Sequence, residues 1–186
     1  MVCIKSTQAL ELSAFYSYDG ANSKGVYLNQ YEIGDYVVCP GHGVAQVIAI
    51  ESKELSGQDH LFYKVRVLMN ELKVMVPANN KNGIRPLVEE NELDSVYQLL
   101  QDHQVDVDRS TWNRRQRVYL EKINSGSIIE VADVMRSLLL TKVSKKLSFS
   151  EKKLLEYCRQ LLVKEISLIT GNAEKNITEQ LDSFFQ

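Results

Sequence analysis

The sequence predicts an α+β protein in which a small antiparallel β barrel is followed by an all-α helical bundle. Residues 31–88 contain five short runs of alternating apolar and polar side chains separated by turn residues, a spacing typical of a small barrel or half-barrel. After Val88, apolar side chains recur with the 3.6-residue period of a helix. The chain has 186 residues, 44% of them apolar, which is enough for two small domains that each bury a core.

Residues 1–30 are expected to form a flexible N-terminal extension. They contain Ser, Ala, Gly and Tyr in no clear period, with one short helical turn expected around Gln8–Phe15. Five strands are expected next, at Asp35–Cys39, Val44–Glu54, His60–Met69, Leu72–Val76 and Ile84–Leu87. Between the first two strands, Pro40-Gly41-His42-Gly43 is expected to be a turn that uses the positive φ available to glycine, since it lacks the third glycine of a phosphate-binding loop.

The remainder of the chain, residues 89–186, is expected to be a helical domain. Helices are predicted over Asn91–Asp102 and from Ser110 or Thr111 to about Asn124. Capping-box patterns then begin at Ser127 and Ser148, and the second precedes the longest helix, which Gly171 is expected to end. A last cap pattern at Asn176 predicts a short terminal helix.

Catalytic and metal-binding chemistry are not indicated by the sequence. His42, His60 and His103 lie in turns or at element ends, and none stands at ligand spacing from a Cys or an acid. The chain contains no GxxxxGK[ST], GxSxG or HExxH pattern. We therefore expect a protein that is not an enzyme and that needs neither a metal nor another cofactor.

Cysteine usage and hydropathy indicate a cytoplasmic protein. The three cysteines, Cys3, Cys39 and Cys158, are widely spaced and form no CxxC pair, which is typical of a reducing compartment. No apolar run approaches the roughly 20 residues that span a bilayer, and the N-terminus lacks the pattern of a signal peptide.

The charges are balanced overall but separated along the chain. The net charge is -2, yet residues 89–110 hold seven acids and one base, and residues 111–146 hold eight bases and three acids. The basic residues concentrate in the helix expected at 111–124, which carries Arg114, Arg115, Arg117 and Lys122 behind the single tryptophan, Trp112. Guanidinium groups pair with phosphate oxygens, and a large ring beside them is typical of proteins that hold distorted duplex DNA.

Two other interpretations of these residues remain open. A single tryptophan is most often a core residue, and arginines on a helix usually form a solvated face that the acidic block could neutralise. A further hypothesis is a reader of cationic side chains, with Tyr36, Phe62 and Tyr63 as an aromatic cage. Alternation places Phe62 and Tyr63 on opposite faces of one strand, which weakens the cage.

Several segments resemble one family in the correct order. Residues 31–44, YEIGDYVVCPGHGV, resemble the opening of the CarD/CdnL family of bacterial RNA-polymerase-binding transcription regulators, and Val74–Pro77 resembles the end of the fourth strand of that family. Thr111–Lys122 is similar to its DNA-contacting helix, and Leu147–Leu155 to the start of its long C-terminal helix. Residues 31–44 also suit the polymerase-interacting module of transcription-repair coupling factors, but this chain has no helicase motor.

The resemblance implies a Tudor-like β domain at 31–88 that binds the RNA polymerase β subunit and a helical domain at 89–186 that touches promoter DNA. Lys53, Met75 and Pro77 would lie on the polymerase-facing strands. Trp112 would be wedged into the minor groove at the upstream edge of the melted bubble and would stabilise the open complex, while adding little to the stability of the fold. The residues expected to contact the DNA backbone are Arg114, Arg115, Arg117 and Lys122.

Two features depart from the family pattern. Some relatives carry arginine where Met75 stands, and the extension at 1–30 is not part of the pattern. An apolar polymerase contact is therefore expected at Met75. The alternative function is a protein–protein adaptor with a Tudor-like module and no direct DNA contact.

Overall fold

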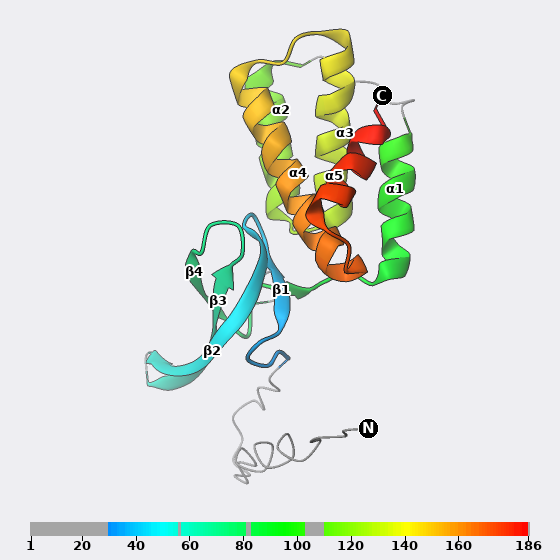
Figure 1. Cartoon of the computed structure of the whole chain (residues 1–186). Coiled ribbons are helices and arrows are strands. Elements are labelled where there is room, and N and C mark those ends of the chain that lie inside the picture. Colours follow the sequence, from blue (N-terminus) through cyan, green and yellow to red (C-terminus); the bar gives the residue numbers. More distant parts are fainter. Residues whose placement is uncertain (1–29, 56, 81–82, 103–109, 186) are drawn as a thin grey trace, which may run out of the picture.

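The computed structural model describes residues 30–55, 57–80, 83–102 and 110–185. The expected extension and the helical turn at Gln8–Phe15 lie outside these residues. Figure 1 shows a small β sheet at one end of the molecule and an upright group of helices at the other. No described helix is long and apolar enough to cross a membrane.

The five predicted strands form one antiparallel sheet with the order β4-β3-β2-β1-β5. The strands are β1 (Tyr36–Cys39), β2 (Gly43–Leu55), β3 (Gln58–Val67), β4 (Lys73–Pro77) and β5 (Arg85–Pro86). The register between β2 and β3 shifts between Val47 and Ala49, a bulge that bends the long β2 strand. Beyond the bulge, the β2–β3 hairpin extends as an arm past the rest of the sheet (Figure 1).

One face of this curved sheet forms its own hydrophobic core. In β3 the side chains of Tyr63, Val65 and Val67 are buried, while Lys64 and Arg66 between them point to the other face. The Tyr31 ring packs edge-on against Tyr63, with the ring centroids 5.5 Å apart. The expected alternation therefore gives the sheet a dry face and a solvent-facing one, and it confirms the small Tudor-like β fold.

Five α-helices and one short 3-10 helix follow the sheet in the described residues. They are η1 (Glu90–Glu92), α1 (Leu93–Gln101), α2 (Trp112–Asn124), α3 (Ile128–Ser144), α4 (Phe149–Thr170) and α5 (Glu174–Ser183). The long predicted helix is α4, which ends at Gly171 with the left-handed φ of +68° that the sequence led us to expect there.

The end caps agree with the sequence except at the last helix. Ser127 and Ser148 cap α3 and α4, and at α4 the box is reciprocal because Glu151 also accepts the backbone N–H of Ser148. The prediction of a cap at Asn176 is wrong. Helix α5 begins at Glu174. The negative charge of the Glu174 carboxylate interacts favourably with the helix dipole at this end, and the carboxylate pairs with Lys164 of α4 at 2.6 Å.

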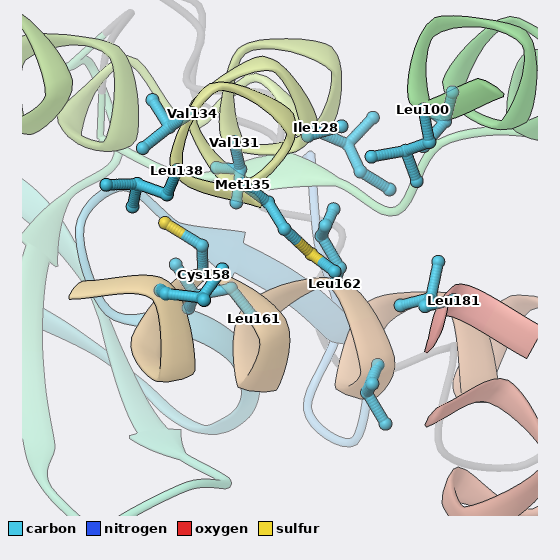
Figure 2. Packing of buried hydrophobic residues seen from close by; sticks show 14 of the residues in the cluster. Leu100, Ile128, Val131, Val134, Met135, Leu138, Cys158, Leu161, Leu162 and Leu181 are labelled. Carbon is cyan, nitrogen blue, oxygen red and sulfur yellow. The ribbon is translucent and has the colours of Figure 1, made fainter. Parts of the chain in front are cut away.

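The helical core is built mainly between α3 and α4. Figure 2 shows Val131, Met135 and Leu138 of α3 facing Cys158, Leu161 and Leu162 of α4, with Leu100 and Leu181 at one side. Burial raises the pKa of the Cys158 thiol to about 12, so this side chain behaves as a small apolar group.

A buried ion pair joins the start of α2 to the start of α4. Nη2 of Arg115 donates to Oε1 of Glu151 over 2.8 Å, and both side chains are only 4% exposed. Burial raises the pKa of Glu151, but hydrogen bonds from Ser148 and Arg115 and the charge of Lys145 outweigh it and lower the pKa to about 2. The carboxylate is therefore ionised throughout the physiological range.

We predict that Glu151→Gln destabilises the fold in a pH-dependent way. At pH 7 the change should cost about 3–5 kcal/mol, because Arg115 remains buried without its counter-charge. The stabilisation by the carboxylate is fully present above its unfolded pKa of 4.5 and is lost as the pH falls through about 2. The difference in unfolding free energy between the two proteins should therefore shrink from pH 6 towards pH 2 in urea titrations.

Glu156→Gln is the matched control, since Glu156 is an exposed carboxylate on the same helix that pairs with Arg159 at 3.8 Å. It should cost less than about 1 kcal/mol at any of these pH values. An equally small cost for Glu151→Gln would contradict the assigned role of the buried pair.

Candidate nucleic-acid interface and sheet surface

Lys53, Met75 and Pro77, predicted from the sequence as one contact surface, lie on the solvent-facing side of the sheet. Met75 stands opposite Lys64, and Pro77 stands opposite Phe62. The Lys53 ammonium group approaches the Met75 sulfur to 3.3 Å, although the two residues are 22 positions apart. We call Lys53, Phe62, Met75 and Pro77 the sheet surface.

The sheet surface combines an apolar centre with charged neighbours. Met75 is 37% exposed and carries no charge, so its contact with the Lys53 ammonium is weak. Glu51 lies between two lysines, 4.0 Å from Lys53 and 3.4 Å from Lys64. This pattern suits a partner that offers an apolar side chain surrounded by charges of both signs.

Helix α2 divides the predicted DNA-contacting residues between its two faces. The buried face repeats every four residues, at Arg115, Tyr119 and Ile123. Arg114 and Arg117 lie on the opposite, solvent-facing side. The side chain of Arg117 is 84% exposed and contacts Glu121 one turn later at 3.2 Å, while Arg114 has no ion pair within the described residues.

Arg115 departs from the sequence-based expectation of a DNA-backbone contact. Its guanidinium is buried against Glu151, as described above, and cannot reach a ligand without breaking that pair. Arg115 therefore holds α2 against α4 and does not belong to the exposed basic surface.

Trp112 occupies the first turn of α2 and is partly buried. Its ring packs against the helical core, tilted against Tyr119 with centroids 6.4 Å apart, and the Arg115 guanidinium lies 5.7 Å from its centroid. The expectation that Trp112 adds little to the fold is therefore not supported. The residue is only partly buried and is the first residue of the helix.

Lys122 lies at the side of α2, where it is partly buried and bonded to Asp133 of α3. Burial tends to raise the pKa of Asp133, but the charges and hydrogen bonds of Lys122 and Arg136 lower it below its usual value. Part of the charge of Lys122 is thus neutralised within the protein, and we rank it below Arg114 and Arg117 as a contact for an anion.

Further basic residues gather at the same end of the bundle. The α3–α4 connection lies at the end away from the sheet (Figure 1), and the Arg115–Glu151 pair brings the first turn of α2 there. Exposed lysines stand on this connection and on the first turn of α4, beside Phe149, which is 82% exposed. They are Lys145, Lys146, Lys152 and Lys153.

We call Trp112, Arg114, Arg117, Phe149 and these four lysines the basic end. Lys152, Lys153 and Phe149 were not predicted from the sequence as site residues, because they begin a helix whose pattern indicates only packing. The sequence feature that could have identified them is the pair of adjacent lysines directly after a capping box.

The aromatic-cage hypothesis finds no support in the described residues. Tyr63 is 2% exposed, and its hydroxyl accepts the backbone N–H of Gln30, so the ring belongs to the core of the sheet. The described part of the chain has no cluster of three His, Cys, Asp or Glu side chains that could hold a metal ion.

Two family models match this chain, one for each half of the fold. The model of the CarD-like/TRCF RID domain matches residues 31–88, which contain the whole sheet. The model of the CarD C-terminal domain matches residues 95–182, which contain α2 to α4.

One curated relative agrees with these matches, and one solved structure is similar in sequence. The protein YdeB of Bacillus subtilis (strain 168), by its name a candidate transcription factor, is 33% identical over 149 residues, which cover 79% of this chain and 97% of YdeB. The solved structure of CdnLNt from Myxococcus xanthus is 36% identical and covers 36% of this chain and 97% of its own, with a TM-score of 0.29. The family models together span most of the described fold, and on this basis the chain belongs to the CarD family.

Proposed function

We propose that this CarD-family protein regulates transcription initiation by bridging RNA polymerase and promoter DNA. The sheet surface would bind the polymerase β subunit, and the basic end would bind DNA at the upstream edge of the melted bubble and stabilise the open complex. The observation that carries the proposal is that the sheet, which carries one surface, and the α3–α4 connection, which carries part of the other, lie at opposite ends of the fold (Figure 1).

The polymerase contact is assigned to the sheet because the CarD-like/TRCF RID model matches this half of the chain. Exposed Met75 and half-buried Pro77 supply an apolar centre, and Lys53 supplies a charge at its edge. Such a centre with a polar rim is the usual anatomy of a protein–protein interface.

The DNA contact is assigned to the basic end because exposed arginines and lysines gather there from α2, the α3–α4 connection and the start of α4. Arg114 and Arg117 project from the outward face of α2, and the Arg115–Glu151 pair joins this helix to the start of α4, which carries Lys152 and Lys153. Contacts of this kind are made to the phosphate backbone and are largely independent of sequence. Trp112 supplies the apolar edge that a minor-groove wedge requires, since its ring is only partly covered.

The adaptor function remains the second candidate, because α2 also exposes apolar side chains. Val118 and Leu120 are each 41% exposed on this helix. A protein partner would cover them, whereas a DNA backbone would not. Salt-dependent binding of the whole chain to duplex DNA separates the two functions, since the adaptor predicts none.

Met75→Asp should weaken binding to RNA polymerase at least tenfold, because it places an unpaired charge in the apolar centre of the contact. The measurement is a titration of polymerase with the full-length protein. Val143→Asp changes an 80% exposed apolar residue of α3 in the same way and should leave the affinity within about twofold. Unchanged polymerase binding by Met75→Asp would show that the sheet surface does not form the contact with polymerase.

Arg117→Ala should weaken DNA binding equally on all sequences and should lower the slope of log affinity against log salt by about one unit. The same result is expected for Arg114→Ala. Lys175→Ala is the matched control, because Lys175 on α5 is 85% exposed and also pairs with a glutamate one turn later, at 3.8 Å. If these variants changed which DNA sequences bind best but left the salt slope unchanged, the two arginines would contact bases and not the DNA backbone.

Trp112→Ala should shorten the lifetime of the open promoter complex while leaving polymerase binding intact. The lifetime falls about tenfold for each 1.4 kcal/mol of stabilisation that the ring provides relative to the closing transition state. Because the ring packs on Tyr119, the same change should cost about 1–3 kcal/mol of folding stability, less than the 3–5 of a fully buried ring.

Trp112→Phe separates the two roles of this residue, since the smaller ring keeps an apolar contact with Tyr119 but reaches less far from the helix. It should lower the thermal stability only slightly and still shorten the lifetime, as measured by challenge with a DNA competitor. Normal open-complex lifetimes for both variants would show that the Trp112 ring does not act as the wedge.

A further inference from the structure

We propose that Arg85, Glu165 and the Pro40–Gly43 turn form a clasp that sets the direction of α2 relative to the sheet surface. Arg85 and Glu165 are then positioning residues for the bridge. The inference rests on the proposed function for its purpose, but the clasp itself can be tested without polymerase or DNA.

Arg85 contacts two segments of the helical bundle. Its Nη1 and Nη2 atoms donate to the two carboxylate oxygens of Glu165 on α4, over 2.7 and 3.0 Å. Its Nε donates to the carbonyl oxygen of Gly126, which follows α2, over 2.6 Å. One side chain of the last strand therefore binds α4 and the C-terminal end of α2 at once.

The bidentate geometry makes this contact directional. The planar guanidinium meets a carboxylate with two parallel bonds, which fixes orientation as well as distance. Glu165 is 5% exposed, and the Arg85 side chain is 26% exposed, so water screens the pair little. A pair of this kind resists rotation of the sheet against the bundle more than a surface ion pair would.

The Pro40–Gly43 turn supplies the second half of the clasp. Gly43 has a φ of +84°, and a Cβ atom there would lie 2.6 Å from Cδ2 of Leu161 on α4. At Gly41, with a φ of +72°, a Cβ atom would lie 2.5 Å from Oδ1 of Asn124 on α2. The hydroxyl group of Tyr157 donates to the carbonyl oxygen of Gly41. The glycines therefore allow the turn to approach both helices closely.

The position of the clasp matters because it holds the end of α2 farthest from Trp112. A helix of 13 residues is about 20 Å long, so a tilt of about 10° at one end moves the other by about 3 Å. A displacement of this size exceeds the tolerance of a hydrogen bond to phosphate. Loosening the clasp should therefore displace the basic end from DNA that the bound polymerase holds in place.

The linkage of two binding surfaces explains what the clasp would contribute. When one surface is bound, the second binds as an intramolecular step, and its effective concentration depends on the geometry of the connection. A rigid connection with the correct direction raises that concentration, because less orientational freedom is lost on binding. Loosening the clasp should thus weaken the bridge without changing either surface.

The test uses full-length Arg85→Met and Glu165→Gln, which keep most of each side chain but remove the paired charges. Arg159→Met is the matched control, because the ion pairs of Arg159 are made to Asp182 of α5 and Glu156 of α4, both within the bundle. Nitroxide labels attached at Lys73→Cys on β4 and Asn113→Cys on α2 report the distance between the sheet and the helix. Cys3→Ser removes one competing thiol, and the other two native cysteines, Cys39 and Cys158, are buried.

The clasp predicts that Arg85→Met and Glu165→Gln broaden or shift this distance distribution, while Arg159→Met lowers the melting temperature and leaves the distribution narrow. It also predicts that the first two variants bind polymerase alone and DNA alone within about twofold of wild type, yet bind the polymerase–promoter complex at least fivefold more weakly.

An unchanged distance distribution in both clasp variants would overturn the inference. Broadened distributions with unaltered affinity for the polymerase–promoter complex would also overturn it, because the clasp would then have no positioning role. Failure of the wild-type protein to bind DNA or polymerase would refute the proposed function instead, and the distance measurement would still decide whether the clasp exists.

Discussion

The buried pair of Arg115 and Glu151 is the interaction on which the arrangement of the helical domain depends. It joins the first turns of α2 and α4 where both side chains are buried, and the capping box at Ser148 helps to hold the carboxylate in place. Breaking such a pair leaves a buried charge, which is far more costly than losing a surface contact. The pair brings the exposed arginines of α2 beside the lysines of α4.

A similar arginine–glutamate pair holds the other end of α2. Arg85 reaches the carbonyl group of Gly126 just after the helix and bonds Glu165 near the end of α4. Helix α2 is therefore fixed at both ends to α4, and only its outward face is free to meet a partner. In a protein that bridges two large molecules, this arrangement would allow a binding event at the sheet to determine where the basic end lies.

The sequence predicted the fold well because the fold follows from local patterns. The strand alternation around Tyr63, the capping box at Ser148 and the stop at Gly171 depend on neighbouring residues, and the structure confirms them. The cap at Asn176 was wrong, since α5 begins two residues earlier at Glu174, whose carboxylate lies in the first turn and pairs with Lys164 of α4. Long-range contacts of this kind leave no periodic signal.

The candidate site was less predictable for the same reason. A helical wheel separates Arg115 from Arg114 and Arg117, but it does not show which face meets the core, because an arginine is expected in solvent. Only the distant Glu151 makes Arg115 a buried residue. The role of Arg85 was equally hidden, since its partner lies 80 residues away. The Pro40–Gly43 turn was recognised as a turn, but its close approach to two helices was not.

The claim that one chain must carry both surfaces can be tested by mixing two defective proteins. One would be Met75→Asp, which keeps the basic end, and the other Arg114→Ala with Arg117→Ala, which keeps the sheet surface. The measurement is the lifetime of an open promoter complex under competitor challenge. A bridge predicts that wild-type protein lengthens the lifetime and that the mixture does not. Recovery of the wild-type lifetime by the mixture would contradict the account, because the two surfaces would then act independently.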